Sequence, residues 1–228
     1  MDIEKTLFWI GHASFYVKAK GQTIFIDPFN LGAEIKEKAD LILITHAHAD
    51  HCDKGSVSKI MKPGTEVMGP ADCLENLGIK DGKAVKPGHS EIWREISVST
   101  VPAYNNKSGR ENFHPKRNGW VGWVLNVGTF GSDDFIIYHG GDTDFIDEMK
   151  GFARYGIGAS LLPIGGTYTM DVEEAIEAQK SIGAKHAVPM HYKNLLGREG
   201  SEKAEARFRQ ALPNAFVMKE VQPQTFRF

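Results

Sequence analysis

Alternation between apolar and polar residues marks the first third of the chain and predicts a β-rich start. Residues 14–19 and 22–27 alternate in this way on either side of Lys20-Gly21, a pair typical of a hairpin turn. Residues 41–44 form an uninterrupted apolar run, Leu-Ile-Leu-Ile, which is typical of a short buried strand. We therefore expect strands in all three segments, the first two of them joined as a hairpin.

Helical periodicity is clearest in the second half. Residues 171–182 carry an apolar stripe at helical spacing and are followed by Gly183, which predicts a helix that ends there. A last helix is predicted for residues 201–212, with Ser201 as its N-cap. The remaining predictions are helices at residues 54–61 and 71–77, and strands at residues 96–101, 121–127, 135–139, 160–164 and 186–190. Strands and helices in both halves favour an α/β fold in which two sheets pack face to face with helices outside.

The longest polar stretch interrupts this pattern at residues 104–118. It is too irregular for a core element, and it contains one histidine, His114. Long irregular loops in compact domains are commonly functional or disordered. We therefore treat this segment as a candidate functional loop.

The densest chemical signal directly follows the apolar run at residues 41–44. His46, His48, Asp50 and His51 all lie in the next few residues. Neutral imidazole is a common ligand for zinc and its first-row neighbours, and a nearby carboxylate fits the same sites. His46 and His48 face one side of an extended chain, whereas Asp50 and His51 lie one turn further on, where a single tetrahedral ion would not easily use all four. Two metal ions in one pocket are expected, in preference to a solvated surface turn.

Composition and net charge limit the classes of partner that the protein is expected to bind. The 228 residues, 41% hydrophobic and 25% charged, suit one globular domain over residues 1–228. A net charge of −2 gives no electrostatic case for a nucleic acid or an anionic membrane surface. The N-terminus lacks a signal-peptide layout, no apolar run approaches the ~20 residues that cross a bilayer, and Cys52 and Cys73 make no disulfide framework. We expect a cytoplasmic protein with no nucleic-acid or membrane partner; a homo-oligomer is left open.

The segment His46-Ala47-His48-Ala49-Asp50-His51 resembles the H-x-H-x-D-H signature of the metallo-β-lactamase superfamily. The segments that narrow this resemblance are residues 11–14, 27–28, 141–143, 162–170 and 189–192. They look like the branch that contains L-ascorbate-6-phosphate lactonase and many uncharacterised hydrolases. The resemblance runs from about residue 8 to residue 192. It implies a four-layer αββα sandwich, the metallo-β-lactamase fold, with its ligands on loops at one edge.

The same resemblance implies a set of ligands for two divalent ions, most readily zinc, with manganese, nickel or iron as alternatives. By match to the superfamily pattern, the first ion takes His46, His48 and His114, the second takes Asp50, His51 and His191, and Asp142 bridges them. Asp50 would also accept or donate a proton during turnover, so Asp50 and Asp142 are the catalytic candidates. The expected nucleophile is a metal-bridging hydroxide.

His114 has a competitor as the last ligand of the first ion. Many relatives in this branch place a histidine just after a Val-Pro-Ala segment, whereas here residues 101–103 continue with Tyr104-Asn105. This departure leaves His114 as the obvious donor and Asn105 as the alternative. The loop position of His114 is otherwise typical of an exposed histidine.

Further residues are expected around the ligands. Asp27 ends a predicted strand and could fix a ligand histidine by accepting its other N–H. His12 is expected either to line the pocket or to be a packed core histidine. Lys116 and Arg117 follow His114 closely and either hold an anionic substrate group or are solvated loop charges. Tyr168 is expected as a further substrate contact.

The function implied is hydrolysis of a small, anionic metabolite: a lactone, an ester or a phosphoester. Two other classes occur in the same superfamily. One is a di-metal redox or non-catalytic metal-binding protein, and the other is a phosphodiesterase or nuclease. The histidine at position 51 and the absence of an added domain favour hydrolysis over the redox class. Nuclease relatives usually carry extra RNA-binding elements or an inserted domain, which are not seen in this sequence.

Overall fold

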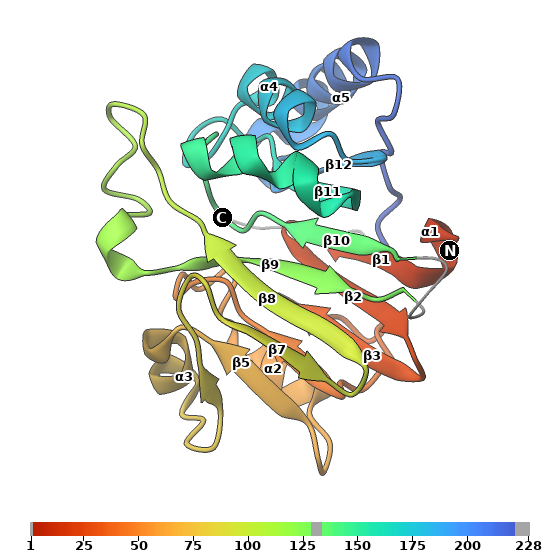
Figure 1. Cartoon of the computed structure of the whole chain (residues 1–228). Coiled ribbons are helices and arrows are strands. Elements are labelled where there is room, and N and C mark those ends of the chain that lie inside the picture. The colour runs from red at the N-terminus through yellow and green to blue at the C-terminus, as the bar shows by residue number, and fades with distance from the viewer. Residues whose placement is uncertain (1, 129–133, 222–228) are drawn as a thin grey trace. The chain divides into compact units, whose positions relative to one another are not determined.

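The computed structural model describes residues 2–128 and 134–221, which form two compact units. The first unit spans residues 1–86 and 219–228, and the second spans residues 87–218. Each unit contains one six-stranded sheet (Figure 1). The prediction of a single domain stays a prediction.

The sheet of the first unit has the strand order β1-β2-β3-β4-β5-β6. Its strands are β1 (Leu7–Gly11), β2 (Ser14–Ala19), β3 (Gln22–Ile26), β4 (Leu41–Leu43), β5 (Glu66–Gly69) and β6 (Lys83–Ala84). The hairpin of β2 and β3 is antiparallel, as is β1 with β2, whereas β3 to β6 are parallel. Strands β1, β3 and β4 therefore run in one direction, and the segments that follow them leave at the same edge of the sheet.

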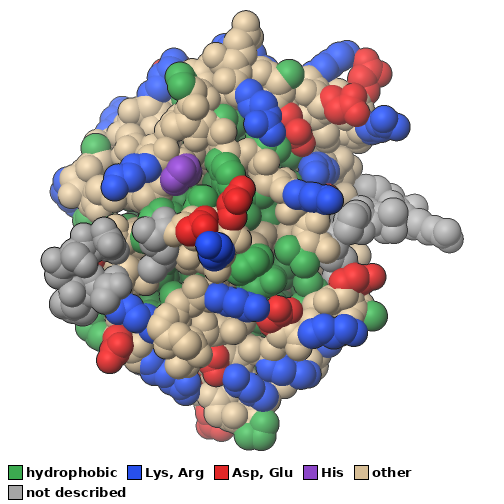
Figure 2. Space-filling view, turned by 90° about the vertical axis from the view of Figure 1, so that its right-hand side faces the viewer, with side chains coloured by type: hydrophobic (Ala, Val, Ile, Leu, Met, Phe, Trp, Pro, Cys, Tyr) green, Lys and Arg blue, Asp and Glu red, His purple; other side chains and the backbone are tan. Residues whose placement is uncertain are grey.

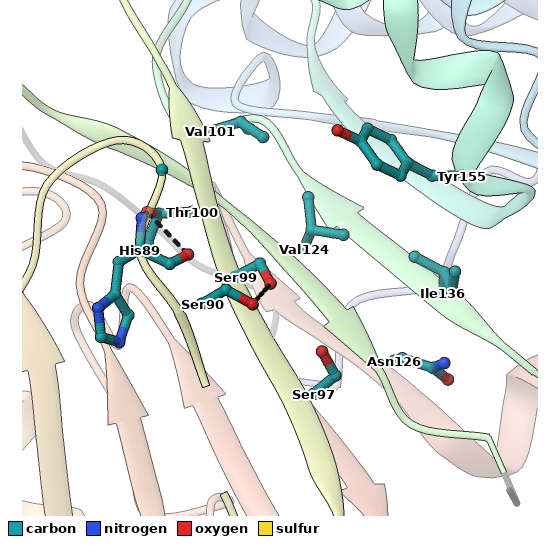
Figure 3. Close-up of a pocket in the computed structure, with 11 residues that line it drawn as sticks. His89, Ser90, Ser97, Ser99, Thr100, Val101, Val124, Asn126, Ile136 and Tyr155 are labelled. Atoms are coloured by element: carbon teal, nitrogen blue, oxygen red, sulfur yellow. Dashed lines mark hydrogen bonds between the residues drawn. The ribbon is translucent and has the colours of Figure 1, made fainter. Parts of the chain in front are cut away.

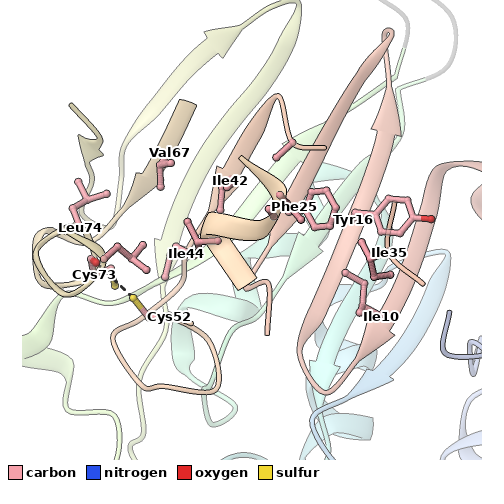
Figure 4. Close-up of a cluster of buried hydrophobic side chains, with 14 residues drawn as sticks. Ile10, Tyr16, Phe25, Ile35, Ile42, Ile44, Cys52, Val67, Cys73 and Leu74 are labelled. Carbon is pink, nitrogen blue, oxygen red and sulfur yellow. Dashed lines mark hydrogen bonds between the residues drawn. The ribbon is translucent and has the colours of Figure 1, made fainter. Parts of the chain in front are cut away.

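Helices α2 (Lys54–Ile60) and α3 (Ala71–Leu77) pack on this sheet through a buried apolar cluster (Figure 4). Ile42 and Ile44 reach the cluster from β4 and the residue that follows it. Cys52 and Cys73 are both buried in it, and the Cys52 thiol donates to the Cys73 carbonyl over 3.5 Å. Full burial of one large aliphatic side chain contributes roughly 1.5–3 kcal/mol, so the cluster fixes the helices, and with them the start of the loop after β4.

The sheet of the second unit has the order β12-β11-β10-β9-β8-β7. Its strands are β7 (Ser90–Trp93), β8 (Ile96–Pro102), β9 (Val121–Asn126), β10 (Ile136–His139), β11 (Ile157–Pro163) and β12 (His186–Met190). Pairing is antiparallel from β7 to β10 and parallel from β10 to β12. Strands β8, β10, β11 and β12 thus run in the same direction, and the segments after them share one edge.

The helical segments of the chain outside α2 and α3 are short at the N-terminus and longer at the C-terminal end. They are α1 (Ile3–Thr6), α4 (Val172–Ile182) and α5 (Lys193–Ala211), with 3₁₀ segments η1 (Lys116–Asn118) and η2 (Asp147–Tyr155). Asp171 caps α4 in a capping box with Glu174, and Gly183, at φ +68°, ends it. Among the described residues, no helix has both the length and the apolarity to span a membrane.

The secondary-structure predictions hold for most elements and fail at the last helix. Ser201 is not an N-cap: α5 begins at Lys193, and the Ser201 hydroxyl donates within the helix to the Gly197 carbonyl over 2.6 Å. The backbone at Gly197 has φ +63° and ψ −173°, so the helix is kinked there and continues on both sides. The elements that were not predicted are short or lack a clear period: α1, β1, β5, β6, β7, η1 and η2.

Charged side chains of both signs are mixed on the surface. On the face shown in Figure 2, Lys and Arg side chains lie among Asp and Glu, with hydrophobic side chains between them. This mixture agrees with the net charge of −2.

Candidate metal centre

The loop after β4 brings three imidazoles of the first unit together. The backbone turns directly after His48, whose carbonyl accepts from the amides of His51 and Cys52 at 3.0 and 2.8 Å. His46 Nε2 lies 3.1 Å from His48 Nδ1, and the His46 and His51 ring centroids are 4.0 Å apart. His46 and His51 are buried, whereas His48 is exposed. The buried strand and the turn therefore concentrate nitrogen donors within a few ångströms.

Asp27, at the end of β3, fixes the orientation of these rings. Its carboxylate is fully buried and accepts from the Thr45 amide at 2.7 Å, from the Thr45 hydroxyl at 2.6 Å and from His51 Nδ1 at 2.7 Å. Because the Thr45 hydroxyl gives its hydrogen to Asp27, its oxygen accepts from His46 Nδ1, 2.9 Å away. Both histidines then carry hydrogen on Nδ1, which leaves their Nε2 atoms as the metal-binding nitrogens.

Asp50 lies close to two further imidazole nitrogens of the same unit. His12, at the carboxyl end of β1, places Nε2 2.9 Å from Asp50 Oδ2, and His51 Nε2 lies 3.9 Å from the same oxygen. The His12 side chain is 5% exposed and that of Asp50 40%. His12 is therefore buried and at the same time directed at a candidate catalytic carboxylate.

The second unit brings its own three candidate ligands together. Asp142 follows β10, His191 follows β12, and His114 lies in the long segment that extends beyond β8 (Figure 1). Asp142 Oδ2 lies 3.3 Å from His114 Nε2 and 3.2 Å from His191 Nε2, and all three side chains are buried. One carboxylate oxygen next to two imidazole nitrogens is a donor arrangement that suits zinc and similar divalent ions.

Asn105 stands behind His114 as its hydrogen-bond partner. Asn105 Oδ1 lies 2.7 Å from His114 Nδ1, and Asn105 Nδ2 donates to Asp144 Oδ1 over 2.9 Å. Asp144 also accepts from the backbone amides of Asn106 and Lys107, at 2.9 Å each. Because the amide hydrogens of Asn105 go to a carboxylate, its oxygen must accept from His114 Nδ1–H. His114 therefore turns Nε2 towards Asp142.

The Lys116 side chain forms contacts with Tyr104 and Glu148 of its own unit. Its ammonium lies 3.1 Å from the Tyr104 hydroxyl and 3.0 Å from Glu148, and the Tyr104 hydroxyl donates to Glu148 over 2.9 Å. Burial raises the pKa of Tyr104, so the phenol is neutral, and hydrogen bonds to Tyr104 and Glu148 raise the pKa of Lys116. Glu148 thus compensates the charge of Lys116. Arg117 is exposed in η1.

Tyr168 is also exposed, and its ring contacts that of Phe113. Neither Phe113 nor several buried supports of the site were identified from the sequence. These missed residues are Thr45, Arg110, Phe113 and Asp144. The sequence offers one weak clue to a role for Asp144 in the site, which is its position two residues after Asp142. Nothing in the sequence shows that it contacts Asn105.

A separate pocket of about 390 Å³ lies on the sheet of the second unit, lined by residues of β7 to β10 and by Tyr155 (Figure 3). Its described lining includes Ser97, Ser99, Val124 and His89, and none of the candidate ligands. His89 Nε2 lies 3.0 Å from Glu91 Oε2.

Comparisons with known proteins agree with this donor chemistry. The family model described as Beta-lactamase superfamily domain matches residues 6–191. A UPF0173 metal-dependent hydrolase of Thermoplasma volcanium is 36% identical over 205 residues, which cover 84% of each chain. The structure of Igni18, a metallo hydrolase of Ignicoccus hospitalis, has 27% identity and a TM-score of 0.74, covering 97% of this chain and 98% of that one.

A more distant structure tests the fold alone. The metallo-beta-lactamase fold protein YhfI of Bacillus subtilis has 15% identity and a TM-score of 0.65, with 94% of both chains covered. The predicted fold class, the metallo-β-lactamase fold, is confirmed by these matches.

Proposed function

Because the chain belongs to the Beta-lactamase superfamily domain family and is a metal-dependent hydrolase, we propose that it uses two divalent ions to hydrolyse a small lactone, ester or phosphoester. The matched residues 6–191 include every candidate ligand. The observation that carries the proposal is Asp142, whose Oδ2 lies within 3.3 Å of two buried imidazole nitrogens. A carboxylate placed in this way is suited to bridge two ions.

The donor set fits two borderline cations. The proposed ligands are His46, His48 and His114 for one ion, Asp50, His51 and His191 for the other, and Asp142 for both. Zinc is the first metal to test, because imidazole and carboxylate are its ordinary nitrogen and oxygen ligands. Two such ions, when bound, would supply a lowered pKa to a coordinated water and would polarise a carbonyl or phosphoryl oxygen of the substrate.

Asp50 is the proposed proton carrier. Its side chain is 40% exposed, so its carboxylate is open to exchange a proton with solvent. His12 Nε2, 2.9 Å away, holds the carboxylate in position by hydrogen bonding to Oδ2. Asp27 and Asn105 keep His51 and His114 in the tautomer whose Nε2 binds metal.

The substrate is proposed to be a small molecule with an electrophilic carbonyl or phosphoryl centre. Of the two residues predicted to bind an anionic group of the substrate, Arg117 is the better candidate, because Glu148 already compensates the charge of Lys116. The mixed surface charge and the net charge of −2 argue against a nucleic-acid substrate.

The test combines metal content with turnover. The protein is reconstituted in turn with Zn²⁺, Mn²⁺ and Ni²⁺, its metal is measured by elemental analysis, and it is assayed on lactones, esters and phosphodiesters. We expect two equivalents of metal in the wild type, and loss of both metal and activity in Asp142→Ala. Asp147→Ala is the matched control, because Asp147 is an exposed aspartate of the same unit that pairs with Lys150.

Three results would overturn the proposal. The first is a metal content that never exceeds one equivalent. The second is near wild-type turnover by Asp142→Ala. The third is iron-bound protein that hydrolyses nothing in the panel, or activity on RNA alone.

A further inference from the structure

We propose that Phe113 and Tyr168 form an aromatic clamp that binds a flat apolar group of the substrate. This inference rests on the proposed hydrolysis of a small molecule and adds the chemistry of the part that is not cleaved. Both side chains belong to the second unit.

The two rings are exposed yet packed on each other. Phe113 is 38% exposed and Tyr168 40%, and their centroids lie 4.9 Å apart at an interplanar angle of 86°. Such an edge-to-face pair is favourable by itself, but it leaves apolar ring surface in water. Two aromatic rings gathered at one exposed place offer apolar ring surface against which a flat ligand group can pack.

The pair stands beside the candidate ligands of its unit. Phe113 directly precedes His114 in the chain. Tyr168 lies in the loop after β11, and at the end of this loop the Met170 amide donates to the Thr143 carbonyl over 3.1 Å, next to Asp142. The start of this loop lies beside the end of β12, which is followed by His191, because the Ile164 amide donates to the Met190 carbonyl over 3.0 Å.

A buried arginine holds both ring-bearing loops in place. Arg110 is 7% exposed, and its guanidinium donates to the carbonyls of Gly166 and Thr169, on either side of Tyr168. Its own carbonyl accepts from the Phe113 amide over 2.9 Å. The same residue thus fixes Phe113 and the Tyr168 loop, so the rings are positioned before any ligand arrives and lose little entropy on binding.

The exposed area of the two rings limits the size of the group that can bind to them. A fully buried aromatic side chain covers about 150–250 Å², so the exposed part of two rings suits one phenyl-sized group. A stable protein interface needs about 800 Å² on each partner, which is far more than two rings supply. The occupant is therefore an aryl or comparably flat apolar substituent of the substrate.

The experiment compares two substrates that differ only in this group. Metal-loaded enzyme is assayed on γ-butyrolactone and on γ-phenyl-γ-butyrolactone, and each variant is expressed as a ratio to wild type so that intrinsic reactivity cancels. For the double variant Phe113→Ala with Tyr168→Ala we expect kcat/KM on the phenyl lactone to fall about tenfold, mainly through KM. On the unsubstituted lactone we expect a change below about twofold.

The control is Ile92→Ala, which removes another exposed apolar side chain of the same unit, 63% exposed on β7. It should change both lactones by less than about twofold. An equal change on both lactones in the double variant, or no change on either, overturns the clamp while the hydrolase assignment stands.

If wild-type enzyme cleaves neither lactone, the proposal that lactones are substrates is wrong. The aromatic clamp is then tested by measuring ligand binding. Isothermal titration calorimetry then measures 4-hydroxy-4-phenylbutanoate and 4-hydroxybutanoate on wild type and on the double variant. Weaker binding of the phenyl compound alone supports the clamp, and unchanged or absent binding refutes it.

Discussion

Two neighbouring glutamates at the start of α4 allow a matched test of a buried and an exposed ion pair. Arg110 Nη2 contacts both oxygens of Glu174 at 2.6 and 2.7 Å, and the Arg110 side chain is 8% exposed. Arg207 binds Glu173 through two nitrogens, with Nε donating to Oε1 at 2.5 Å and Nη2 to Oε2 at 2.7 Å, but its side chain is 43% exposed. The two arginines differ in burial, and Arg110 also contacts Asp144 and two backbone carbonyls.

Replacing Arg110 with Met should destabilise the fold strongly. The change leaves the carboxylates of Glu174 and Asp144, the latter 3.1 Å from Arg110 Nη2, without their buried cation. Breaking a buried pair costs about 3–5 kcal/mol, and because Glu174 is 21% exposed we expect the lower end, about 3 kcal/mol. With a urea m-value of about 2.5 kcal/mol/M, the midpoint of unfolding falls by about 1.2 M.

The pH dependence gives a second readout. Burial raises the pKa of Glu174, but the hydrogen bond from Arg110, the backbone bond at Asp171, the charge of Arg110 and the hydrogen bond from Lys107 outweigh it, so the net pKa lies below 4.5. A lowered pKa contributes stability that is present above the unfolded pKa and is lost as pH falls through the folded pKa. The difference between wild type and Arg110→Met should therefore be largest above about pH 5 and shrink below about pH 4.

Equilibrium urea unfolding followed by far-UV circular dichroism measures both effects. Arg207→Met should shift the midpoint by roughly a third or less of the Arg110→Met shift, because an exposed pair is screened by solvent. Equal shifts in the two variants, or a midpoint for Arg110→Met within about 0.3 M of wild type, would refute the role given to the buried network.

Three other outcomes are expected. Asn105→Ala should weaken metal binding by about 10–100-fold in a chelator competition, since the tautomer of His114 is no longer fixed; an unchanged affinity would contradict this. Metal removal should speed amide hydrogen exchange in residues 104–118, and equal exchange with and without metal would place His114 outside the metal shell. Lys116→Ala combined with Arg117→Ala should raise KM for anionic substrates more than for neutral ones, and equal effects would show that neither charge faces the substrate.

Local patterns explain why much of the fold could be predicted. The β2–β3 hairpin, α3 with Gly78 and α4 with Gly183 each depend on a period and a terminator within a few residues. The same holds for the ligands after β4, which lie so close in the chain that any turn brings them together. Ser201 shows the limit: as a serine before a helical pattern it predicts an N-cap, but the preceding residues are helical as well.

The sequence by itself therefore determined the family, the fold class and the types of donor that a metal would meet. Tertiary structure decided which groups hold those donors: Asp27 reaches His51 across 24 positions, Asn105 reaches Asp144 across 39, and Arg110 reaches Glu174 across 64. These contacts arise because parallel strands bring the segments after their carboxyl ends to one edge of a sheet, whatever their separation in the chain. Periodicity and spacing reflect contacts within one helical turn or one strand. They therefore do not predict contacts between residues that only the order of strands in the sheet brings together.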